Sequence, residues 1–162
     1  MELRDCLKTN LQPGYKIAVL GIGSTLRSDD AAGIYFVELL GKRIKKDNLL
    51  LIAGSTAPEN FTGVIKDFAP DKLFIVDAAY VGGLPGEVKV IPAAEISGVS
   101  FSTHMLPLPV MLKYLAAELP CDVIFIGIQP KSTEHGLVMS EEVKLGTEHL
   151  AEDFAAFLAA AE

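Results

Sequence analysis

Four short, strongly apolar runs recur along the chain, and segments with the helical repeat separate them. Runs without alternating polar residues are typical of parallel strands that are buried on both faces of a sheet. Strands that alternate with helices build layered α/β folds, and four units are too few for a closed barrel. We therefore expect a three-layer α/β sandwich, in which a twisted, mostly parallel sheet carries helices on both faces. The four runs are residues 16–20, 49–52, 73–76 and 123–128.

Turn and capping residues mark the remaining elements. A fifth strand is expected at 87–91, after a turn rich in glycine and proline at 82–86. Four helices are expected to begin near residues 28–30, 56, 107 and 140 and to end near residues 42–46, 68, 118 and 160. Thr56 and Glu59 have the spacing of a capping box at the start of the second helix. The apolar faces comprise Ile34, Val37 and Leu40, then Phe61, Val64, Ile65 and Phe68, then Met111, Leu112 and Leu115, and finally Val143, Leu150, Phe154 and Phe157.

The length and charge of the chain bound its class. It has 162 residues, 50% of them hydrophobic, which suits one core, so we expect a single domain over residues 1–162. A net charge of -7 repels polyanions, and no stripe of Lys and Arg offsets it, so nucleic acid is not an expected partner. No apolar run reaches membrane-spanning length, and residues 1–15 lack the apolar core of a signal peptide. We expect a soluble, cytoplasmic protein without membrane insertion.

Only two cysteines occur, and they do not form a recognisable pair. Cys6 and Cys121 lie in unrelated settings without a CxxC motif, which indicates neither a disulfide framework nor a zinc–thiolate site. Cys121 opens an apolar strand and is interpreted as a core residue. Cys6 lies in the N-terminal segment, to which no element is assigned. Neither cysteine is interpreted as a nucleophile.

Three polar residues follow the predicted strands at the places where ligands bind in open α/β sheets. Such ligands occupy the crevice outside the carboxyl ends of the strands. Asp30 follows the first strand and its glycine loop, Asp77 directly follows the run 73–76, and His104 precedes a predicted helix. Two carboxylates and one imidazole that converge there would form a metal site with oxygen and nitrogen donors and open coordination positions.

Each of these residues also has a structural interpretation. Asp29 or Asp30 can cap the first helix or complement its dipole. Asp77 can cap the loop that follows its strand, although a carboxylate after four apolar residues is costly to bury without a partner. A lone histidine such as His104 is most often structural or exposed. Their joint placement, more than any one residue, favours a functional site.

Other candidate features carry less weight. The loop Gly21-Ile22-Gly23 precedes a helix, as phosphate-binding loops do, but it lacks the third glycine of a dinucleotide fingerprint and has no GK[ST] motif. Glu59 could act as a general base or contact a substrate, and we favour its capping role. A serine-type triad is not supported, because His135 and His149 lie on a late loop and the last helix, away from the hydroxyls near strand ends, which are Ser24, Ser55, Thr56 and Ser102.

Five strings together resemble the hydrogenase maturation proteases, and most closely the HycI-like branch that serves formate-hydrogenlyase-type [NiFe] hydrogenases. They are GIGSTLRSDDAAG, GSTAPENFTGVI, LFIVDAA, STHMLPLPVML and VIFIGIQP, and they span about residues 16–140 in order. The resemblance implies a five-stranded sheet and a monomeric endopeptidase, often classed as aspartic-type. Its substrate would be a [NiFe] hydrogenase large-subunit precursor, from which it removes a short C-terminal extension after nickel insertion.

The resemblance also implies roles for individual residues. By motif position, Asp30, Asp77 and His104 are the catalytic, metal-binding residues, and the nickel arrives with the precursor. Ser24 stands where the family commonly has Asn, and Ala31 where it commonly has Gly. Both substitutions are small and bear on the loop conformation, not on the metal-binding residues. Two alternatives use the same carboxylates: a chaperone that senses nickel without cutting, and a small hydrolase with an activated water.

Overall fold

The computed structural model describes residues 1–98, 100–101, 108–136 and 138–162. Its strands are β1 (Ile17–Ile22), β2 (Leu49–Ser55), β3 (Lys72–Tyr80), β4 (Val88–Ile91), β5 (Ser100–Phe101) and β6 (Asp122–Ile128). Its α-helices are α1 (Leu3–Asn10), α2 (Ala32–Arg43), α3 (Thr62–Phe68), α4 (Leu108–Glu118) and α5 (Glu141–Ala160). Short 3-10 helices are η1 (Ser28–Ala31), η2 (Pro58–Phe61) and η3 (Ala93–Gly98).

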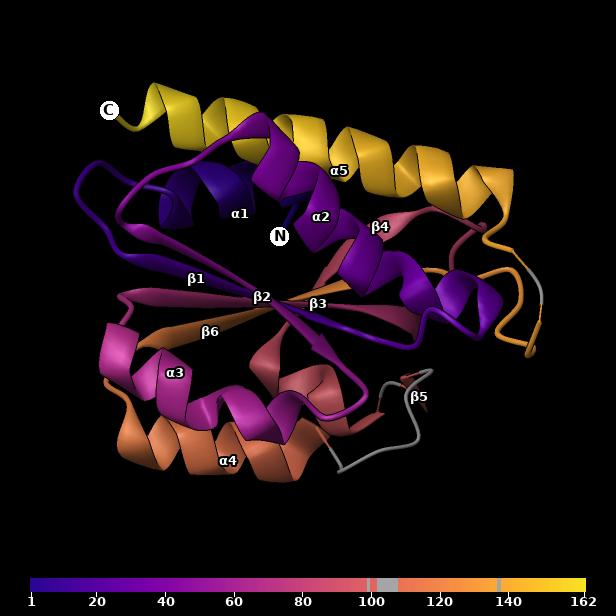
Figure 1. The fold of residues 1–162 in the computed structure, drawn as a ribbon, viewed down its shortest axis with the longest axis horizontal. Helices are drawn as coiled ribbons and strands as arrows, with labels where there is room; N and C mark the ends of the chain where they lie inside the picture. The colour runs from indigo at the N-terminus through magenta and orange to yellow at the C-terminus, as the bar shows by residue number, and fades with distance from the viewer. Residues whose placement is uncertain (99, 102–107, 137) are drawn as a thin grey trace.

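The elements form three layers (Figure 1). Helices α1, α2 and α5 cover one face of the sheet, and α3 and α4 cover the other. The strands lie in the order β2-β1-β3-β6-β4, and β5 pairs with β3 outside this path. Strands β2, β1, β3 and β6 are parallel, whereas β4 runs antiparallel to β6. The predicted three-layer sandwich and its mostly parallel five-stranded sheet are therefore confirmed.

Strand β3 shows why apolar runs mark buried strands. Alternate side chains of a strand point to opposite faces, and here both faces are covered by helices. Residues 73–79 are all buried, so no polar alternation is left in the sequence apart from Asp77. The first core, under α2 and α5, contains Phe74, Val76 and Ala78, and the second core, under α3 and α4, contains Leu73, Ile75 and Ala79.

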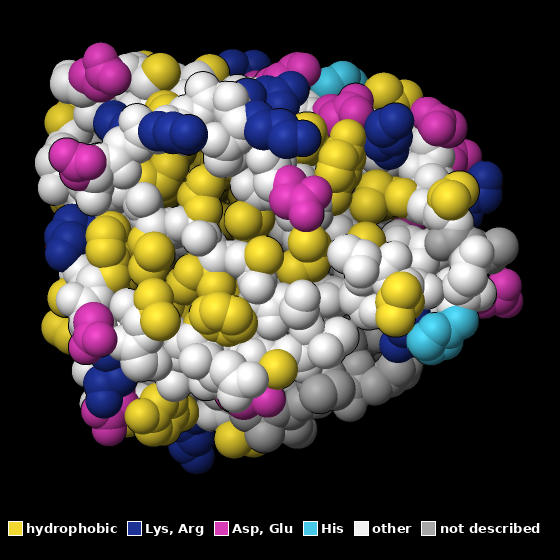
Figure 2. Space-filling view, viewed as in Figure 1, with side chains coloured by type: hydrophobic (Ala, Val, Ile, Leu, Met, Phe, Trp, Pro, Cys, Tyr) yellow, Lys and Arg dark blue, Asp and Glu magenta, His cyan; other side chains and the backbone are white. Residues whose placement is uncertain are grey.

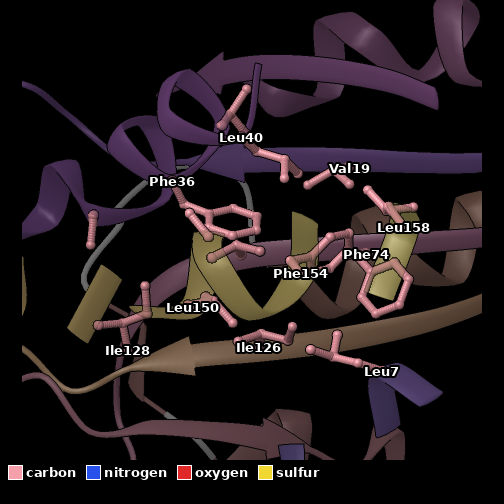
Figure 3. Packing of buried hydrophobic residues seen from close by; sticks show 14 of the residues in the cluster. Leu7, Val19, Phe36, Leu40, Phe74, Ile126, Ile128, Leu150, Phe154 and Leu158 are labelled. Carbon is pink, nitrogen blue, oxygen red and sulfur yellow. The ribbon is translucent and has the colours of Figure 1, made fainter. Parts of the chain in front are cut away.

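Three aromatic rings hold the first core together (Figure 3). Phe154 of α5 packs edge-on against Phe36 of α2 and Phe74 of β3, with ring centroids 5.5 and 4.9 Å apart. Edge-to-face pairs of this kind each contribute about 0.5–1.5 kcal/mol beyond the burial of their area. Helices α2 and α5 are thereby fixed to the middle of the sheet, and the loops that precede them are fixed with them.

The structure differs from the sequence-based expectation in the N-terminal segment and on α3. Helix α1 lies where no element is expected, and it buries Cys6 and Leu7. On α3, Val64 is exposed although it is expected on the apolar face, because the short helix buries only Ile65 fully. In the described part of the chain, no helix is long and apolar enough to cross a membrane.

Strand β2 is the edge of the sheet that faces the viewer in Figures 1 and 2. Hydrophobic side chains gather on the surface where it passes (Figure 2). Its first three residues, all leucine, are half-buried. The strand carries no charged residue and no proline, the residue types with which proteins commonly protect a sheet edge.

Candidate functional site

The carboxyl ends of β1, β2 and β3 meet at one edge of the sheet, which lies on the right in Figure 1. Asp77 lies within β3 near this edge and is fully buried. Asp30 lies in η1, which packs against β3, and only 1% of its surface is exposed. The structure therefore brings the two predicted aspartates to the same sheet edge.

The glycine loop is shaped around Asp30. The Ser24 amide donates a hydrogen bond of 2.9 Å to Asp30 Oδ2. Gly23 has φ 141°, and a Cβ on it would lie 1.8 Å from the Asp30 carbonyl oxygen, so only glycine fits. The loop thus orients the Asp30 carboxylate through backbone geometry, and the absence of a phosphate-binding fingerprint in its sequence agrees with this structural role.

Close packing of α2 on the sheet brings Asp30 to the crevice. A Cβ on Gly33 would lie 2.3 Å from the Val76 carbonyl oxygen and 2.4 Å from that of Ile22. The first turn of α2 therefore rests directly on the backbone of β1 and β3. Because Val76 precedes Asp77, this contact fixes η1 beside the strand that carries the second aspartate.

Asp29 has a different role from its neighbour. Its side chain is fully buried and accepts hydrogen bonds from the backbone amides of Lys131 (2.8 Å), Ser132 (3.1 Å) and Ser140 (2.7 Å), and from the Ser140 hydroxyl (2.9 Å). Its carboxylate therefore fastens the glycine-loop region to the segment 131–140, and we call these contacts the Asp29 clamp. The interpretation of Asp29 as a cap of α2 is wrong, because all of these donors lie more than a hundred residues away.

The prediction for His104 lies outside the described residues, as does that for Ser102. Among the described residues, no group of three or more His, Cys, Asp and Glu side chains could hold a metal ion. In the predicted metal site, Asp30 and Asp77 would supply the oxygen donors and His104 the nitrogen donor.

Glu59 is half-buried and does not cap a helix. The N-cap of η2 is Ala57, not Thr56, and no side chain caps this turn. The expected capping box is therefore wrong, because the chain enters the helix through a 3-10 turn that begins at Pro58. Glu59 Oε2 is buried, and within the described ranges it has no hydrogen-bond partner. A carboxylate oxygen buried in this way is destabilising. Glu59 therefore remains a candidate for a general base or a substrate contact.

The remaining nucleophile candidates gain no support. His135 and His149 are exposed, and in the described segments neither forms a hydrogen bond to a serine. Cys121 lies just before β6, at the opposite end of the sheet from Asp77. Burial raises the pKa of the Cys6 and Cys121 thiols, which disfavours the reactive thiolate.

Comparison with known proteins decides the family. The family model described as "Hydrogenase maturation protease" matches residues 34–156. A curated relative from Methanocaldococcus jannaschii, provisionally named a hydrogenase maturation protease, is 38% identical over 155 residues, which cover 91% of each chain. The chain belongs to the hydrogenase maturation protease family. The residues that match the family model make up most of the chain and include β3 with Asp77.

Solved structures of family members have the same fold. The crystal structure of the [NiFe] hydrogenase maturation protease HycI from Thermococcus kodakarensis superposes with a TM-score of 0.86 at 34% identity, covering 95% of this chain and 99% of that one. The solution structure of the endopeptidase HycI from Escherichia coli gives a TM-score of 0.76 at 30% identity, covering 88% and 90%. The resemblance noted on the five sequence strings is therefore confirmed at the level of family and fold.

Proposed function

We propose that this protein is an endopeptidase that removes the C-terminal extension of a [NiFe] hydrogenase large-subunit precursor after nickel insertion. The observation that carries the proposal is the pair of buried carboxylates, Asp30 and Asp77, at one sheet edge of a chain in this family. Two relatives are named as a maturation protease and an endopeptidase, which supports the reaction class. We propose further that the protein acts as a monomer in the cytoplasm.

Nickel is part of the substrate in this proposal. Thiolates of the precursor would hold the ion, and Asp30, Asp77 and His104 would complete its coordination. The chemistry of the described donors fits this role, because carboxylate oxygens bind divalent ions and Asp30 is held in place by the Ser24 amide. The crevice would then accept the precursor only when nickel is present, so the site works as a checkpoint on metal insertion.

Positioning would supply much of the rate. The rigid glycine loop and the contact of Gly33 with Val76 hold Asp30 beside β3, so little reorganisation is needed when the precursor binds. A divalent ion in such a site polarises a carbonyl or acidifies a water. One carboxylate would accept a proton from the attacking water, whose oxygen bonds to the scissile carbonyl carbon, and the departing amine would receive a proton as the C–N bond breaks. In this sense the enzyme is an aspartic-type peptidase, with two acids that need not share one proton.

Mass spectrometry of the large subunit tests the proposal. Nickel-loaded precursor should lose a C-terminal peptide when incubated with this protein, and metal-free precursor should stay intact. Asp30→Asn should abolish the cut, whereas Asp67→Asn, which removes the same charge from an exposed position on α3, should not. If the wild-type protein binds loaded precursor tightly and releases no peptide, the protein is a nickel-sensing chaperone and the peptidase proposal fails. Turnover of small esters or amides without any precursor would instead indicate a general hydrolase.

A further inference from the structure

A third acidic residue, Glu59, follows the carboxyl end of β2. Ser55 at this end pairs with Ile22 of β1, one residue after the position at which β1 pairs with Val76 of β3. Ser55 and Asp77 therefore lie at one level of the sheet, two strand spacings or about 10 Å apart. Glu59 lies in η2, which begins three residues after Ser55 and packs against β2. It thus belongs to the same edge of the sheet as the candidate site.

Glu59 and Asp77 also approach this edge from the same face of the sheet. Alternate residues of a strand point to one face, so Asp77 points to the side of Ile75 and Ala79, which belong to the second core. Helices α3 and α4 cover that side, and η2 leads directly into α3 (Figure 1). Asp30 reaches the edge from the other face, where η1 leads into α2. Acidic side chains therefore approach the crevice from both faces.

The glycine loop connects the end of β2 to Asp30. The Gly23 amide donates a hydrogen bond of 2.9 Å to the Ser55 carbonyl. The next amide, that of Ser24, donates to Asp30 Oδ2, also at 2.9 Å. Only four residues separate Ser55 from Glu59 along the chain. Backbone bonds over a short path therefore set where Glu59 lies relative to the Asp30 carboxylate.

The side chain of Glu59 gains no stabilising contact in the part of the chain that the structure describes. Oε2 is buried there without a hydrogen-bond partner, while the residue as a whole is half-buried and reaches the surface. Its backbone, in contrast, is anchored, because the Thr62 hydroxyl donates to the Glu59 carbonyl (3.1 Å). A buried carboxylate oxygen without a donor destabilises the fold, and natural proteins tolerate such costs mainly at functional sites. The position of Glu59 thus favours a functional role over a structural one.

This role is not that of a third metal ligand. Among the residues that the structure describes, no three His, Cys, Asp or Glu side chains form a group that could hold a metal ion. Glu59 therefore does not join Asp30 and Asp77 in one set of ligands. A carboxylate that binds an ion shares its lone pairs with the metal, whereas a carboxylate beside the ion keeps them for a proton. Hydrolytic metal sites use an acidic residue outside the ligand set in this way.

We propose that Glu59 is the general base of the cleavage reaction, while Asp30 and Asp77 bind the nickel of the precursor. This inference rests on the proposed function and assigns the proton transfer that it leaves open. The Glu59 carboxylate accepts a proton from the attacking water as the water oxygen bonds to the scissile carbonyl carbon. When the C–N bond breaks, this proton passes from Glu59 to the departing amine, so the carboxylate is regenerated.

Processing kinetics with nickel-loaded precursor test this role. Glu59→Gln keeps the size of the side chain but cannot take up the proton, so kcat should fall at least about a hundredfold while KM stays within about twofold. Glu38→Gln is the matched control, because it removes the same charge from an exposed position on α2, and its kcat should equal that of the wild-type protein. A folded Glu59→Gln protein with unchanged kcat, whether or not its KM rises, overturns the assignment.

Chemical rescue separates a lost base from a damaged fold. Glu59→Ala removes the carboxylate and leaves space for a small acid, so added formate should restore part of its kcat in proportion to concentration and should leave the wild-type kcat unchanged. Such rescue supports the base even if Glu59→Gln fails to fold, and a folded Glu59→Ala protein that formate does not rescue overturns it. If the wild-type protein cuts the precursor and these variants cut it equally fast, only the Glu59 assignment fails. If the wild-type protein does not cut it, the proposed function fails as well.

Discussion

The Asp29 clamp makes a quantitative prediction about stability. In Asp29→Asn one carboxylate oxygen becomes an amide nitrogen, which donates and cannot accept. Every group that faces the two oxygens is itself a donor, namely two amides at Oδ2 and, at Oδ1, the amide and hydroxyl of Ser140. The arrangement that loses least places the nitrogen at Oδ1, because the Ser140 hydroxyl also lies 2.9 Å from Oδ2 and can keep its bond there.

The loss is then one hydrogen bond, from the Ser140 backbone amide to a buried, charged acceptor. Bonds of this kind contribute about 1.5–3 kcal/mol each, so we expect Asp29→Asn to lower the free energy of unfolding by about 2–3 kcal/mol. For a chain of this size that corresponds to a fall in Tm of about 5–10 °C. Asp29→Ala leaves all three amides without an acceptor, and we expect a loss of about 3–5 kcal/mol.

Urea unfolding monitored by far-ultraviolet circular dichroism measures these changes, with the slope of the transition checked to be constant. Asp67→Asn is the control for the loss of charge, since Asp67 is exposed, and it should change stability by less than about 0.5 kcal/mol. If Asp29→Asn changes the free energy of unfolding as little as the control does, Asp29 does not clamp the two loops and the reasoning is refuted.

Four further outcomes are expected. Gly33→Ala should lower Tm and slow processing, because its Cβ would overlap the Val76 carbonyl; unchanged Tm would contradict the close contact. Glu59→Gln should raise Tm in thermal unfolding, as it removes a charge with a buried oxygen, and a fall in Tm would point to a partner for that charge. Burial, and then the hydrogen bond from Tyr35 to Glu148, raise the pKa of Tyr35 from 10.0 to about 12. The folded state thus holds the phenol proton more tightly than the unfolded state does, and the resulting stabilisation is complete below pH 10 and declines towards pH 12. Phenolate absorbance should show Tyr35 ionising at lower pH in Glu148→Gln than in the wild-type protein. The variants Asp30→Asn, Asp77→Asn and His104→Ala should each fold and should each process nickel-loaded precursor at least about a hundredfold more slowly, as followed by mass spectrometry. Full activity in one of these variants would remove that residue from the site.

The sequence predicts the sheet well because burial on both faces leaves uninterrupted apolar runs. Strand β3 is the clearest case, since Asp77 is the one polar residue among the buried residues 73–79 and thereby identifies itself. Helix α5 spans Glu141–Ala160, in agreement with the helix expected from about residue 140 to residue 160. Helix α1 is missed because charged residues surround the two that it buries, Cys6 and Leu7.

The candidate site is predicted less completely, for a physical reason. The groups that hold Asp29 are mainly backbone amides of residues 131–140, and a backbone amide leaves no mark on the sequence. The distinction between Asp29 and Asp30 therefore cannot be made from the adjacent pair of letters. Glu59 is misassigned because the capping-box spacing fits Thr56, whereas the chain begins the turn one residue later, with Ala57 as N-cap.

The Asp29 clamp also has a consequence for the order in which the molecule is completed during translation. Asp29 and Asp30 are synthesised more than a hundred residues before residues 131–140, whose bonds fix the surrounding loop. Contacts of such high sequence separation close late in folding. A nascent chain that already contains both aspartates therefore still lacks the Ser140 contact. We therefore expect the loop that carries Asp29 and Asp30 to be fastened only after residue 140 has been synthesised.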